Sequence, residues 1–457
     1  MEDKRYLQFA RLFQANGEPP IADGMLEIDG SRITKVGTSA DFAHEIATTP
    51  GAKVELYEGA TALPGLVDAH CHITLSGDSR PYEDQARDPD EMLTLIAVRN
   101  MELHLSRGVT TLRDNGARNR TGFVVREAIR RGYISGPRLL LSGRPVTHSG
   151  GHFHWCNGVA DGEEAIRAAV RLLVSEGADH IKLMASGGGT GGNIPYLPSY
   201  NARELKVAVE TAHALERPTT AHCRATSSMV NAMDAGLDCI EHGEFLIPAP
   251  MKDYGSGVAA AGVMQYDPAV AARLIESGTY LSYTIQAGGY DTLLRLRRQT
   301  MEGARLDGSQ QAQATMLAEF FEGKQAILAA LVQDGILPRL VISSDAGPFD
   351  VAFGTLQYGL ELAVQAGLSP TDAIVAATRT AAEACSVAAD IGTLDVGKEA
   401  DILIVSGDPT KDVTALRNVV AVYMGGSRVR GLSDQLDRAH AADDVQARSH
   451  RITAGAC

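Results

Sequence analysis

The fold is decided by residues 62–72, ALPGLVDAHCH, where an apolar run ends directly on an aspartate and two histidines. Apolar, strand-like runs recur seven more times along the chain. They are VTTLRDNG (109–116), RLLLSG (138–143), DHIKLMA (179–185), PTTAHC (218–223), LDCIEHG (237–243), TYLSYT (279–284) and LVISSDAG (340–347). Strands that alternate with amphipathic helices are typical of parallel β/α units. Eight such units in succession predict a closed (β/α)8 barrel over residues 63–389.

Amphipathic helical patterns follow these strands. They include DEMLTLIAVRNMELHLSRG (90–108), EEAIRAAVRLLVSEG (163–177), ARELKVAVETAHALE (202–216), QAILAALVQDG (325–335) and SPTDAIVAATRTAAEAC (369–385). A doubly wound open sheet is the structural alternative, but no GxGxxG follows the first strand and opens a helix. The glycines at 187–189 and 191–192 resemble a phosphate-binding loop only superficially, because no GK[ST] follows them. The barrel is therefore the favoured architecture.

The two ends of the chain read as short strands. Near the start, MLEIDG and SRITKVG are joined at Asp29-Gly30, and near the end VVAVYMGG and SRVRG turn at Gly425-Gly426. Both pairs favour tight hairpins. The first sixty residues therefore predict a small antiparallel sheet.

We expect residues 1–62 and 390–430 to form one small β-sandwich domain, although they lie far apart in the sequence. Residues 431–457 are polar and Ala-rich, and they predict a tail or a short surface helix. After strands six to eight, long loops are expected to shape the pocket, at about residues 243–268, 285–310 and 346–368. Four aromatic residues in or near these loops could line it: Tyr290, Phe349, Phe353 and Tyr358.

The composition excludes several classes of protein. The net charge is -14 and there is no basic run, which argues against a nucleic-acid partner. No stretch approaches about 18 consecutive apolar residues and the start lacks an apolar leader, so we expect a cytoplasmic protein without a membrane partner. The six cysteines are scattered without a CxxC pair, which favours reduced thiols over a disulfide framework.

Polar residues at the ends of barrel strands are candidates for an active site, because such sites are built there. His70 and His72 alternate on one strand and therefore point to the same side. Two neutral imidazoles can supply half of a tetrahedral metal shell, although an HxH pair also occurs by chance on exposed loops.

Four further strands bring candidate residues to the same end: Lys182, His222, His242 and Asp345. Lys182 lies within an apolar strand, where a buried ammonium is costly unless it is paired or neutralised. From the residues alone it could form an ordinary salt bridge or be an amine with a lowered pKa. The joint occurrence of these ligand types on five strand ends argues against isolated buried residues.

These motifs resemble the amidohydrolase superfamily from LPGLVDAHCH to GTLDVGKEADILIV, which is nearly the whole chain. The resemblance implies two divalent metal ions, zinc by default and manganese or cobalt as alternatives. It implies that His70, His72 and Asp345 bind one ion and that His222 and His242 bind the other. It also implies that Lys182, carboxylated by carbon dioxide, bridges the two ions.

Several segments resemble one branch of this superfamily, which contains imidazolonepropionase-like amidohydrolases and the Xaa-Pro and Xaa-Lys/Arg dipeptidases. Phenylurea and thiocarbamate hydrolases are relatives of this branch. The segments are GVTTLRD, HSGGHFHW, GADHIKLMASGG, IEHG and SSDAG. The resemblance implies that His152 contacts the scissile carbonyl. His154 and Trp155, in the same loop, are further candidates for substrate binding. Arg224 stands where the dipeptidases often have Tyr, and a guanidinium would bind a carboxylate well. It could instead pair with Glu241 or Glu244.

The resemblance implies that the protein hydrolyses an amide-type C–N bond in a small molecule by means of a metal-bridging hydroxide. Asp345 would carry the proton, and a dipeptide or N-acyl amino acid is the favoured substrate. The first alternative is hydrolysis of neutral aryl ureas, carbamates or anilides. A mononuclear deaminase is less favoured, because Cys223, Arg224 and Ala225 follow His222 where a Glu is expected. A binding protein that has lost catalysis is the remaining alternative. A homo-oligomer is expected from the resemblance.

Overall fold

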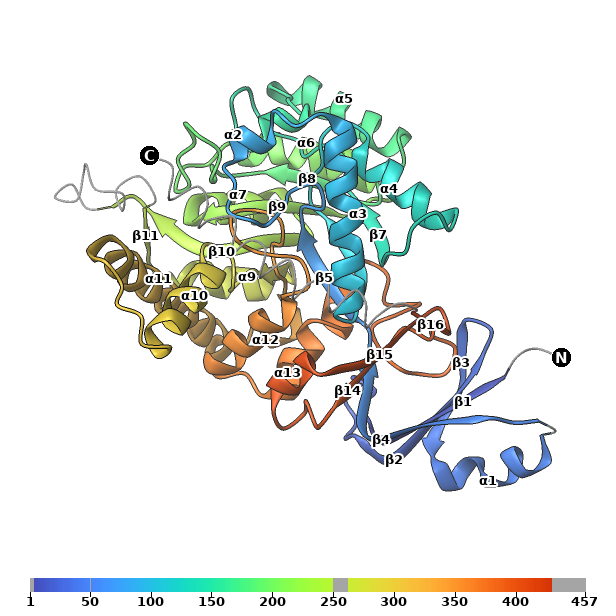
Figure 1. The fold of residues 1–457 in the computed structure, drawn as a ribbon. Helices are drawn as coiled ribbons and strands as arrows, with labels where there is room; N and C mark the ends of the chain where they lie inside the picture. Colours follow the sequence, from blue (N-terminus) through green and yellow to red (C-terminus); the bar gives the residue numbers. More distant parts are fainter. Residues whose placement is uncertain (1–3, 50, 250–261, 430–457) are drawn as a thin grey trace.

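The computed structural model describes residues 4–49, 51–249 and 262–429. Its largest part is a barrel of eight parallel strands, which confirms the predicted architecture (Figure 1). The strands are β5 (Leu66–Cys71), β6 (Val109–Asp114), β7 (Arg138–Leu141), β8 (Ile181–Met184), β9 (Thr219–Ala225), β10 (Cys239–Ile247), β12 (Tyr280–Tyr283) and β13 (Leu340–Ile342). Each overlaps one of the eight apolar runs of the sequence, and β9 and β10 extend beyond theirs to Ala225 and Ile247.

Two short contacts close the barrel between its two sheets. β5, β6 and β7 form one sheet, and β8, β9, β10, β12 and β13 form the other. Between β7 and β8, the Val146 amide donates to the Lys182 carbonyl at 2.8 Å. Between β13 and β5, the Asp345 amide donates to the His70 carbonyl at 2.8 Å. The closure therefore passes directly through three of the predicted site residues.

Helices cover the outside of the barrel and connect its strands in sequence. They are α2 (Tyr82–Gln85), α3 (Asp90–Ser106), α4 (Thr121–Arg130), α5 (Gly162–Ser175), α6 (Ala202–His213), α7 (Thr226–Ala235), α9 (Pro268–Ser277), α10 (Tyr290–Met301), α11 (Gly308–Asp334), α12 (Leu356–Gln365), α13 (Pro370–Ala376) and α14 (Arg379–Ala384). Short 3-10 turns lie at His154–Cys156, Leu337–Arg339 and Val413–Arg417, and the short strand β11 (Val263–Met264) pairs with β10. The helices bury their apolar faces against the strands in one large core.

The chain ends form a separate β domain beside the barrel (Figure 1). Its seven strands are β1 (Arg5–Leu12), β2 (Ile21–Asp29), β3 (Arg32–Thr38), β4 (Val54–Pro64), β14 (Ile402–Ser406), β15 (Val419–Met424) and β16 (Ser427–Arg428). They form one sheet in the order β16-β15-β14-β4-β1-β2-β3. β1 and β4 pair in parallel, so the expected antiparallel sheet is in fact mixed.

The β sheet curls so that its β3 edge meets the segment leading into β14. The Ile33 amide donates to the Lys398 carbonyl at 2.9 Å, and the Ala400 amide donates to the Ser31 carbonyl at 2.7 Å. A separate apolar cluster fills the domain. The helix α1 (Ser39–Thr48), which the strand reading missed, begins with a capping box between Thr38 and Asp41.

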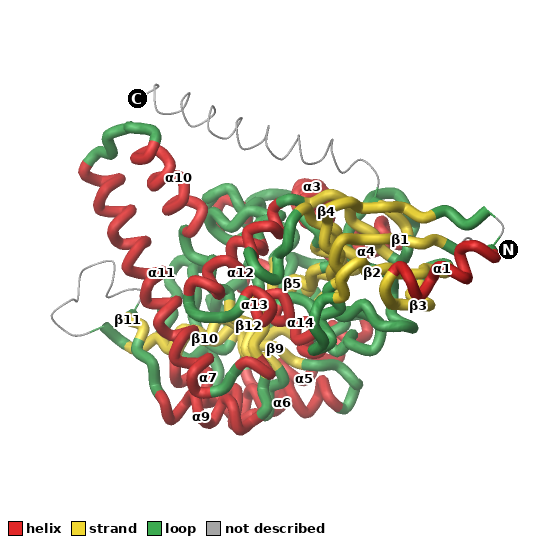
Figure 2. The backbone as a smooth tube through the Cα atoms, turned by 90° about the horizontal axis from the view of Figure 1, so that it is seen from below, coloured by secondary structure: helices red, strands yellow, loops and turns green. Residues whose placement is uncertain are grey.

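Two of the three expected pocket loops contain helices instead. Within residues 285–310 lies α10, and within residues 346–368 lies α12. α10 forms a long hairpin with α11, which stands out from the barrel in Figure 2. The predicted helix over residues 369–385 is broken into α13 and α14 at Ala377 and Thr378. Part of the loop at 243–268, and the predicted tail at 431–457, lie outside the described residues.

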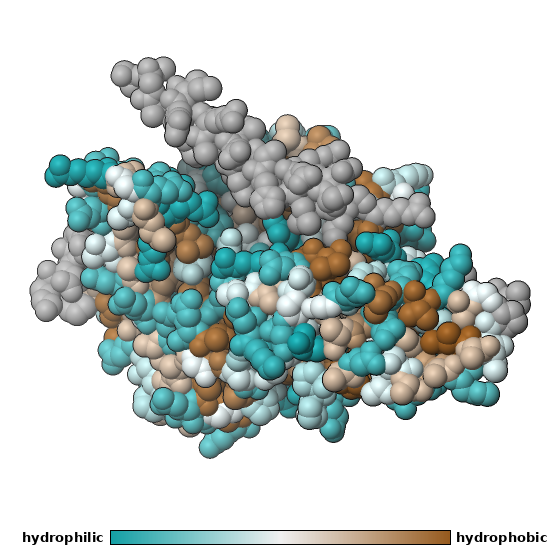
Figure 3. Space-filling model, turned by 60° about the horizontal axis from the view of Figure 1, so that its bottom comes forward, coloured by the Kyte–Doolittle hydropathy of each residue, from teal (hydrophilic) through white to brown (hydrophobic). Residues whose placement is uncertain are grey.

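The surface of the described residues mixes polar and apolar side chains. On the face shown in Figure 3, hydrophobic side chains lie in separate patches among hydrophilic ones. Across the described ranges, every helix is too short or too polar to span a bilayer. The five cysteines at positions 71, 156, 223, 239 and 385 are buried and free, as the scattered spacing predicted.

Candidate metal centre

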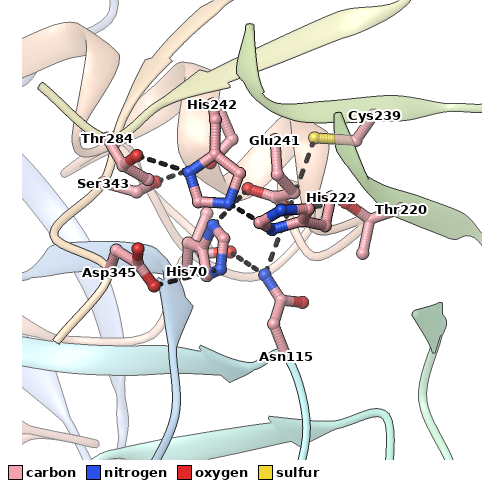
Figure 4. A network of polar contacts seen from close by, with 12 residues as sticks. His70, Asn115, Thr220, His222, Cys239, Glu241, His242, Thr284, Ser343 and Asp345 are labelled. Carbon is pink, nitrogen blue, oxygen red and sulfur yellow. Dashed lines mark hydrogen bonds and ion pairs between the residues drawn. The ribbon is translucent and has the colours of Figure 1, made fainter. Parts of the chain in front are cut away.

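The six predicted ligands come from five strands, or from the residues just after them, and lie at the same end of the barrel. His70 is on β5, Lys182 on β8, His222 on β9 and His242 on β10, while His72 and Asp345 directly follow β5 and β13. All six side chains are buried. Nitrogen or oxygen atoms of His70, His242 and Asp345 lie within 4.8 Å of one another (Figure 4). The structure therefore brings the predicted site residues together.

His70, His72 and Asp345 form one half of this centre. Nε2 of His70 lies 3.4 Å from Nε2 of His72 and 3.4 Å from Oδ1 of Asp345. Nδ1 of His72 faces the Gly116 carbonyl at 3.2 Å, and Nδ1 of His70 faces Oε2 of Glu241 at 2.8 Å. A carbonyl or a carboxylate can only accept, so both Nδ1 atoms carry the proton. The two Nε2 lone pairs then face the same space as the Asp345 carboxylate.

His222 and His242 form the other half. Nε2 of His222 donates to the Gly187 carbonyl at 3.0 Å, which leaves a lone pair on its Nδ1. That atom lies 2.8 Å from Nε2 of His242, whose Nδ1 contacts the Thr284 hydroxyl at 2.8 Å. Metal-binding histidines are commonly oriented by a partner on the ring nitrogen that does not bind the metal. Four imidazoles here have such a partner.

Burial determines the charge state of the histidines. It holds the pKa of His72, His222 and His242 well below the usual value, and the neighbouring His and Lys side chains lower it further. Neutral imidazole is the form that binds a metal. The donor set therefore fits divalent cations.

Lys182 lies on β8, close enough to His72, His222 and His242 to lower the pKa of each. It is fully buried, and its Nζ has no hydrogen-bond partner among the described residues. Burial lowers the pKa of its amine, although Glu241 and Asp345 oppose that shift. A buried, unpartnered amine is costly unless it is neutralised or modified. Within the described ranges, Lys182 does not form the ordinary salt bridge that the sequence left open.

His242 and Asp345 have an unusual backbone. Their φ angles are +70° and +56°, in the left-handed region that non-glycine residues rarely adopt. Such conformations cluster at functional sites, where the surrounding structure holds them in place. In β10 the bend also lets two consecutive residues, Glu241 and His242, point into the barrel.

Sequence reasoning missed the role of Glu241. Its carboxylate is fully buried and accepts from Arg113 at 2.8 Å. It also accepts from Asn115 at 3.1 Å and from Thr220 at 2.5 Å (Figure 4). Burial alone would raise the pKa of Glu241, but His70, Arg113 and Lys182 hold it well below its usual value. In a regular strand, neighbouring residues point to opposite faces, so Glu241 is expected to point away from the side that His242 occupies. The sequence therefore did not indicate that Glu241 also points into the barrel, because this depends on the backbone bend at His242. Its position makes it the residue that orients His70.

A small cavity opens above the centre. His152 and Arg224 line it, as expected, together with Asp345 and three of the histidines. Nδ1 of His152 contacts the Thr190 hydroxyl at 2.8 Å, and burial lowers the pKa of its ring. The aromatic lining consists of Tyr82, Phe153, Phe320 and Phe349.

Several expected lining residues lie elsewhere. The His154 ring hydrogen-bonds the Gly151 carbonyl, Trp155 stacks on Phe153, and neither residue lines the cavity. Of the four aromatic residues expected from the loops, only Phe349 lines it. Tyr290 and Tyr358 are held by α10 and α12, and Phe353 packs on His104. The helices that replace the loops explain this difference.

Arg224 pairs with Glu244, one of the two acids considered for it. Its Nε lies 2.5 Å from Oε2 of Glu244, while the side chain still lines the cavity. Oε1 of the same glutamate lies 3.1 Å from Nζ of Lys324, a buried lysine on α11. Burial would raise the pKa of Glu244, but the two cations lower it to about 2.

A second group of possible ligands, Asp68, Cys71 and His104, lies deeper in the barrel. Nδ1 of His104 accepts from the Gly354 amide at 2.7 Å, so Nε2 carries the proton and donates to Asp68 at 3.1 Å. Burial raises the pKa of the Cys71 thiol well above its usual value. This group is a satisfied hydrogen-bond network and does not fit a metal ion.

Residues 61–429 match the model of the amidohydrolase family. The chain is 26% identical over 454 residues to ochratoxinase from Aspergillus niger, covering 92% of this chain and 85% of that protein. It is 23% identical over 389 residues to imidazolonepropionase from Symbiobacterium thermophilum, covering 84% of each.

Solved structures share the fold over almost the full length. A Xaa-Pro dipeptidase with bound methionine in its active site superposes with a TM-score of 0.74 at 23% identity, covering 94% of this chain and all of that one. Phenylurea hydrolase B superposes with a TM-score of 0.72 at 19% identity, covering 94% and 97%. These structures support a barrel with an additional β domain.

Proposed function

This chain belongs to the amidohydrolase family, and on that premise we propose that it hydrolyses an amide-type C–N bond in a small molecule with two divalent metal ions. The observation that carries the proposal is the set of four histidines, each held by a partner on its outer nitrogen, around a buried aspartate and an unpartnered lysine. Such a set has no stabilising role without cations to fill it.

The residues fit two adjacent positions. His70, His72 and Asp345 would hold one ion, and His222 and His242 the other. Carboxylation of Lys182 would turn its buried amine into an anionic bridge between them, which removes the cost of leaving it unpartnered. Zinc suits these imidazoles best, with manganese or cobalt as alternatives. When bound, the ions would supply Lewis-acid activation of water and of the carbonyl group.

Asp345 is the proton carrier in this proposal. Its side chain lines the cavity, and its Oδ1 lies 3.4 Å from Nε2 of His70 and 3.7 Å from Nε2 of His72. It would accept a proton from the attacking water and deliver it to the leaving nitrogen, which is a poor leaving group without one. His152 lines the same cavity and would contact the scissile carbonyl oxygen.

The favoured substrate is a dipeptide or an N-acyl amino acid. Arg224 lines the cavity and would bind a carboxylate on the leaving-group side. The four aromatic side chains of the lining suit an apolar acyl group, and they equally favour the second candidate, a neutral aryl urea, carbamate or anilide. The ochratoxinase and phenylurea hydrolase relatives fit these two candidates.

A three-substrate assay tests the proposal. The chain is given an N-acyl amino acid, its methyl amide and the same acyl group on aniline, and release of the acyl acid is followed in the wild type and in Arg224→Met. We expect the free carboxylate to be hydrolysed best by the wild type and to lose about ten- to a hundredfold in kcat/KM in Arg224→Met. Preference for the anilide, unaffected by Arg224→Met, would instead assign the chain to hydrolysis of neutral compounds.

A further inference from the structure

Lys324 is a lysine in the core whose ammonium group has an acceptor for each of its three N–H bonds. It lies on α11 and is fully buried. Its Nζ donates to the carbonyls of Thr284 at 2.8 Å and Ala287 at 3.0 Å, and it lies 3.1 Å from Oε1 of Glu244. Three acceptors around one nitrogen match the three N–H bonds of an ammonium, whereas a neutral amine has two. Lys324 is therefore a buried cation.

Glu244 lies between this cation and Arg224. Each of its oxygens faces one of them, Oε1 facing Lys324 and Oε2 facing Arg224. One negative charge is thus shared by two positive charges. We call Arg224, Glu244 and Lys324 the charge trio, and its formal charge is +1.

The position of the charge trio makes this excess charge chemically relevant. Arg224 and Glu244 line the cavity, while Lys324 lies behind Phe320, its Nζ 5.3 Å from the centre of that ring. Apart from Asp345, which belongs to the metal centre, the other described lining residues carry no charge. An Arg–Glu pair alone would be neutral, and it would not favour the binding of a substrate anion.

We infer that Glu244 and Lys324 set the charge selectivity of the cavity: Lys324 offsets the charge of Glu244, so that Arg224 keeps a full positive charge for an anionic group of the substrate. This inference rests on the proposed function and names its substrate class as anionic amides. Glu244 fixes the guanidinium through Nε and leaves the terminal nitrogens for the ligand.

Two substitutions move the charge of the trio in opposite directions. Lys324→Met makes it neutral, and Glu244→Gln, which keeps the shape of the side chain, raises it to +2. The measured quantity is the ratio of kcat/KM for an N-acyl amino acid to that for its methyl amide. We expect this ratio to fall by about tenfold or more in Lys324→Met and to rise above the wild-type value in Glu244→Gln.

A loss of packing alone would lower both rates together and leave the ratio unchanged, and that result would overturn the inference. A lower ratio in Glu244→Gln would overturn it as well. If Lys324→Met does not fold, Glu244→Gln decides by itself. Arg144→Met is the matched control, because Arg144 forms a 2.8 Å ion pair with Glu176 and does not line the cavity. We expect it to keep the wild-type ratio.

Failure of the proposed function gives a different result. In that case the wild type hydrolyses neither member of the pair. The charge selectivity is then read from binding, by titration calorimetry of the same two compounds against the same proteins. A wild type and two variants that bind both compounds equally would overturn the inference independently of catalysis.

Discussion

Each histidine of the metal centre has a partner on the ring nitrogen that faces away from the centre. His70 faces Glu241, His72 faces a backbone carbonyl, His222 donates to Gly187 and His242 contacts Thr284. These partners hold each ring in one orientation and set which nitrogen keeps its lone pair. The sequence revealed the histidines because they end apolar strands, but it could not reveal these partners, since they come from other strands and from the backbone.

Asp114 gives a prediction at this scale. It lies at the end of β6, accepts from the Ile73 amide at 3.0 Å, and burial raises its pKa from 3.8 to about 7. Between these two values the folded chain keeps a proton that the unfolded chain has lost, so stability falls as pH rises from about 4 to 7 and then levels off. Asp114→Asn removes this ionisation. Its thermal midpoint relative to wild type should rise from pH 5 to 7 and stay level above pH 7.

The measurement is a series of melting curves on chelator-treated protein, so that loss of metal at low pH does not contribute. A difference between Asp114→Asn and wild type that stays constant from pH 5 to pH 8 would show that Asp114 is already ionised in the folded chain.

Secondary-structure elements bring the site together through their ends and the loops that follow them. The glycines after β8 are the clearest case. A Cβ on Gly188 would lie 2.4 Å from Nε2 of His152, and one on Gly189 would lie 2.5 Å from the Phe349 ring. The glycine run, which lacks the GK[ST] of a phosphate loop, lets two other loops approach the segment after β8.

Gly188→Ala therefore has a predictable effect. The added methyl group must displace the His152 ring, and a shift of about 1 Å in a group that positions the substrate can lower the rate by about 10²-fold. We expect kcat/KM to fall by about that factor while metal content stays at the wild-type level. Gly308→Ala, at the start of α11, is the matched control because its Cβ meets no atom within 4 Å. Wild-type turnover in Gly188→Ala would refute this role for the glycine.

The barrel strands could be predicted from the sequence, but two of the helices could not. All eight barrel strands were predicted, because apolar runs ending in polar residues follow from the parallel barrel itself. The helices α10 and α12 were expected to be loops. Their amphipathic patterns are short and lie between a strand and a longer helix, so they read as connections. The helix predicted over residues 325–335 covers only the C-terminal part of α11 and begins just after Lys324, so Lys324 could not be placed beside Glu244.

The chain passes between the two parts of the molecule twice, and the crossing from β4 into β5 is the shorter one. β4 of the β domain ends at Pro64 and β5 of the barrel begins at Leu66, and a Cβ on the intervening Gly65 would meet Thr110 at 2.1 Å. An ion pair of 2.8 Å between Arg138 and Asp401 adds a further connection. The β domain therefore anchors the strand that carries His70.

The central claim, a centre for two metal ions bridged by Lys182, is tested most directly by elemental analysis of protein purified without chelators. We expect about two divalent ions per chain in the wild type and about one or fewer in Lys182→Ala, because the histidines and Asp345 complete two shells only with the bridge. Lys206→Ala, which removes an exposed lysine on α6, should keep about two ions. One ion per chain in the wild type, unchanged in Lys182→Ala, would contradict the account.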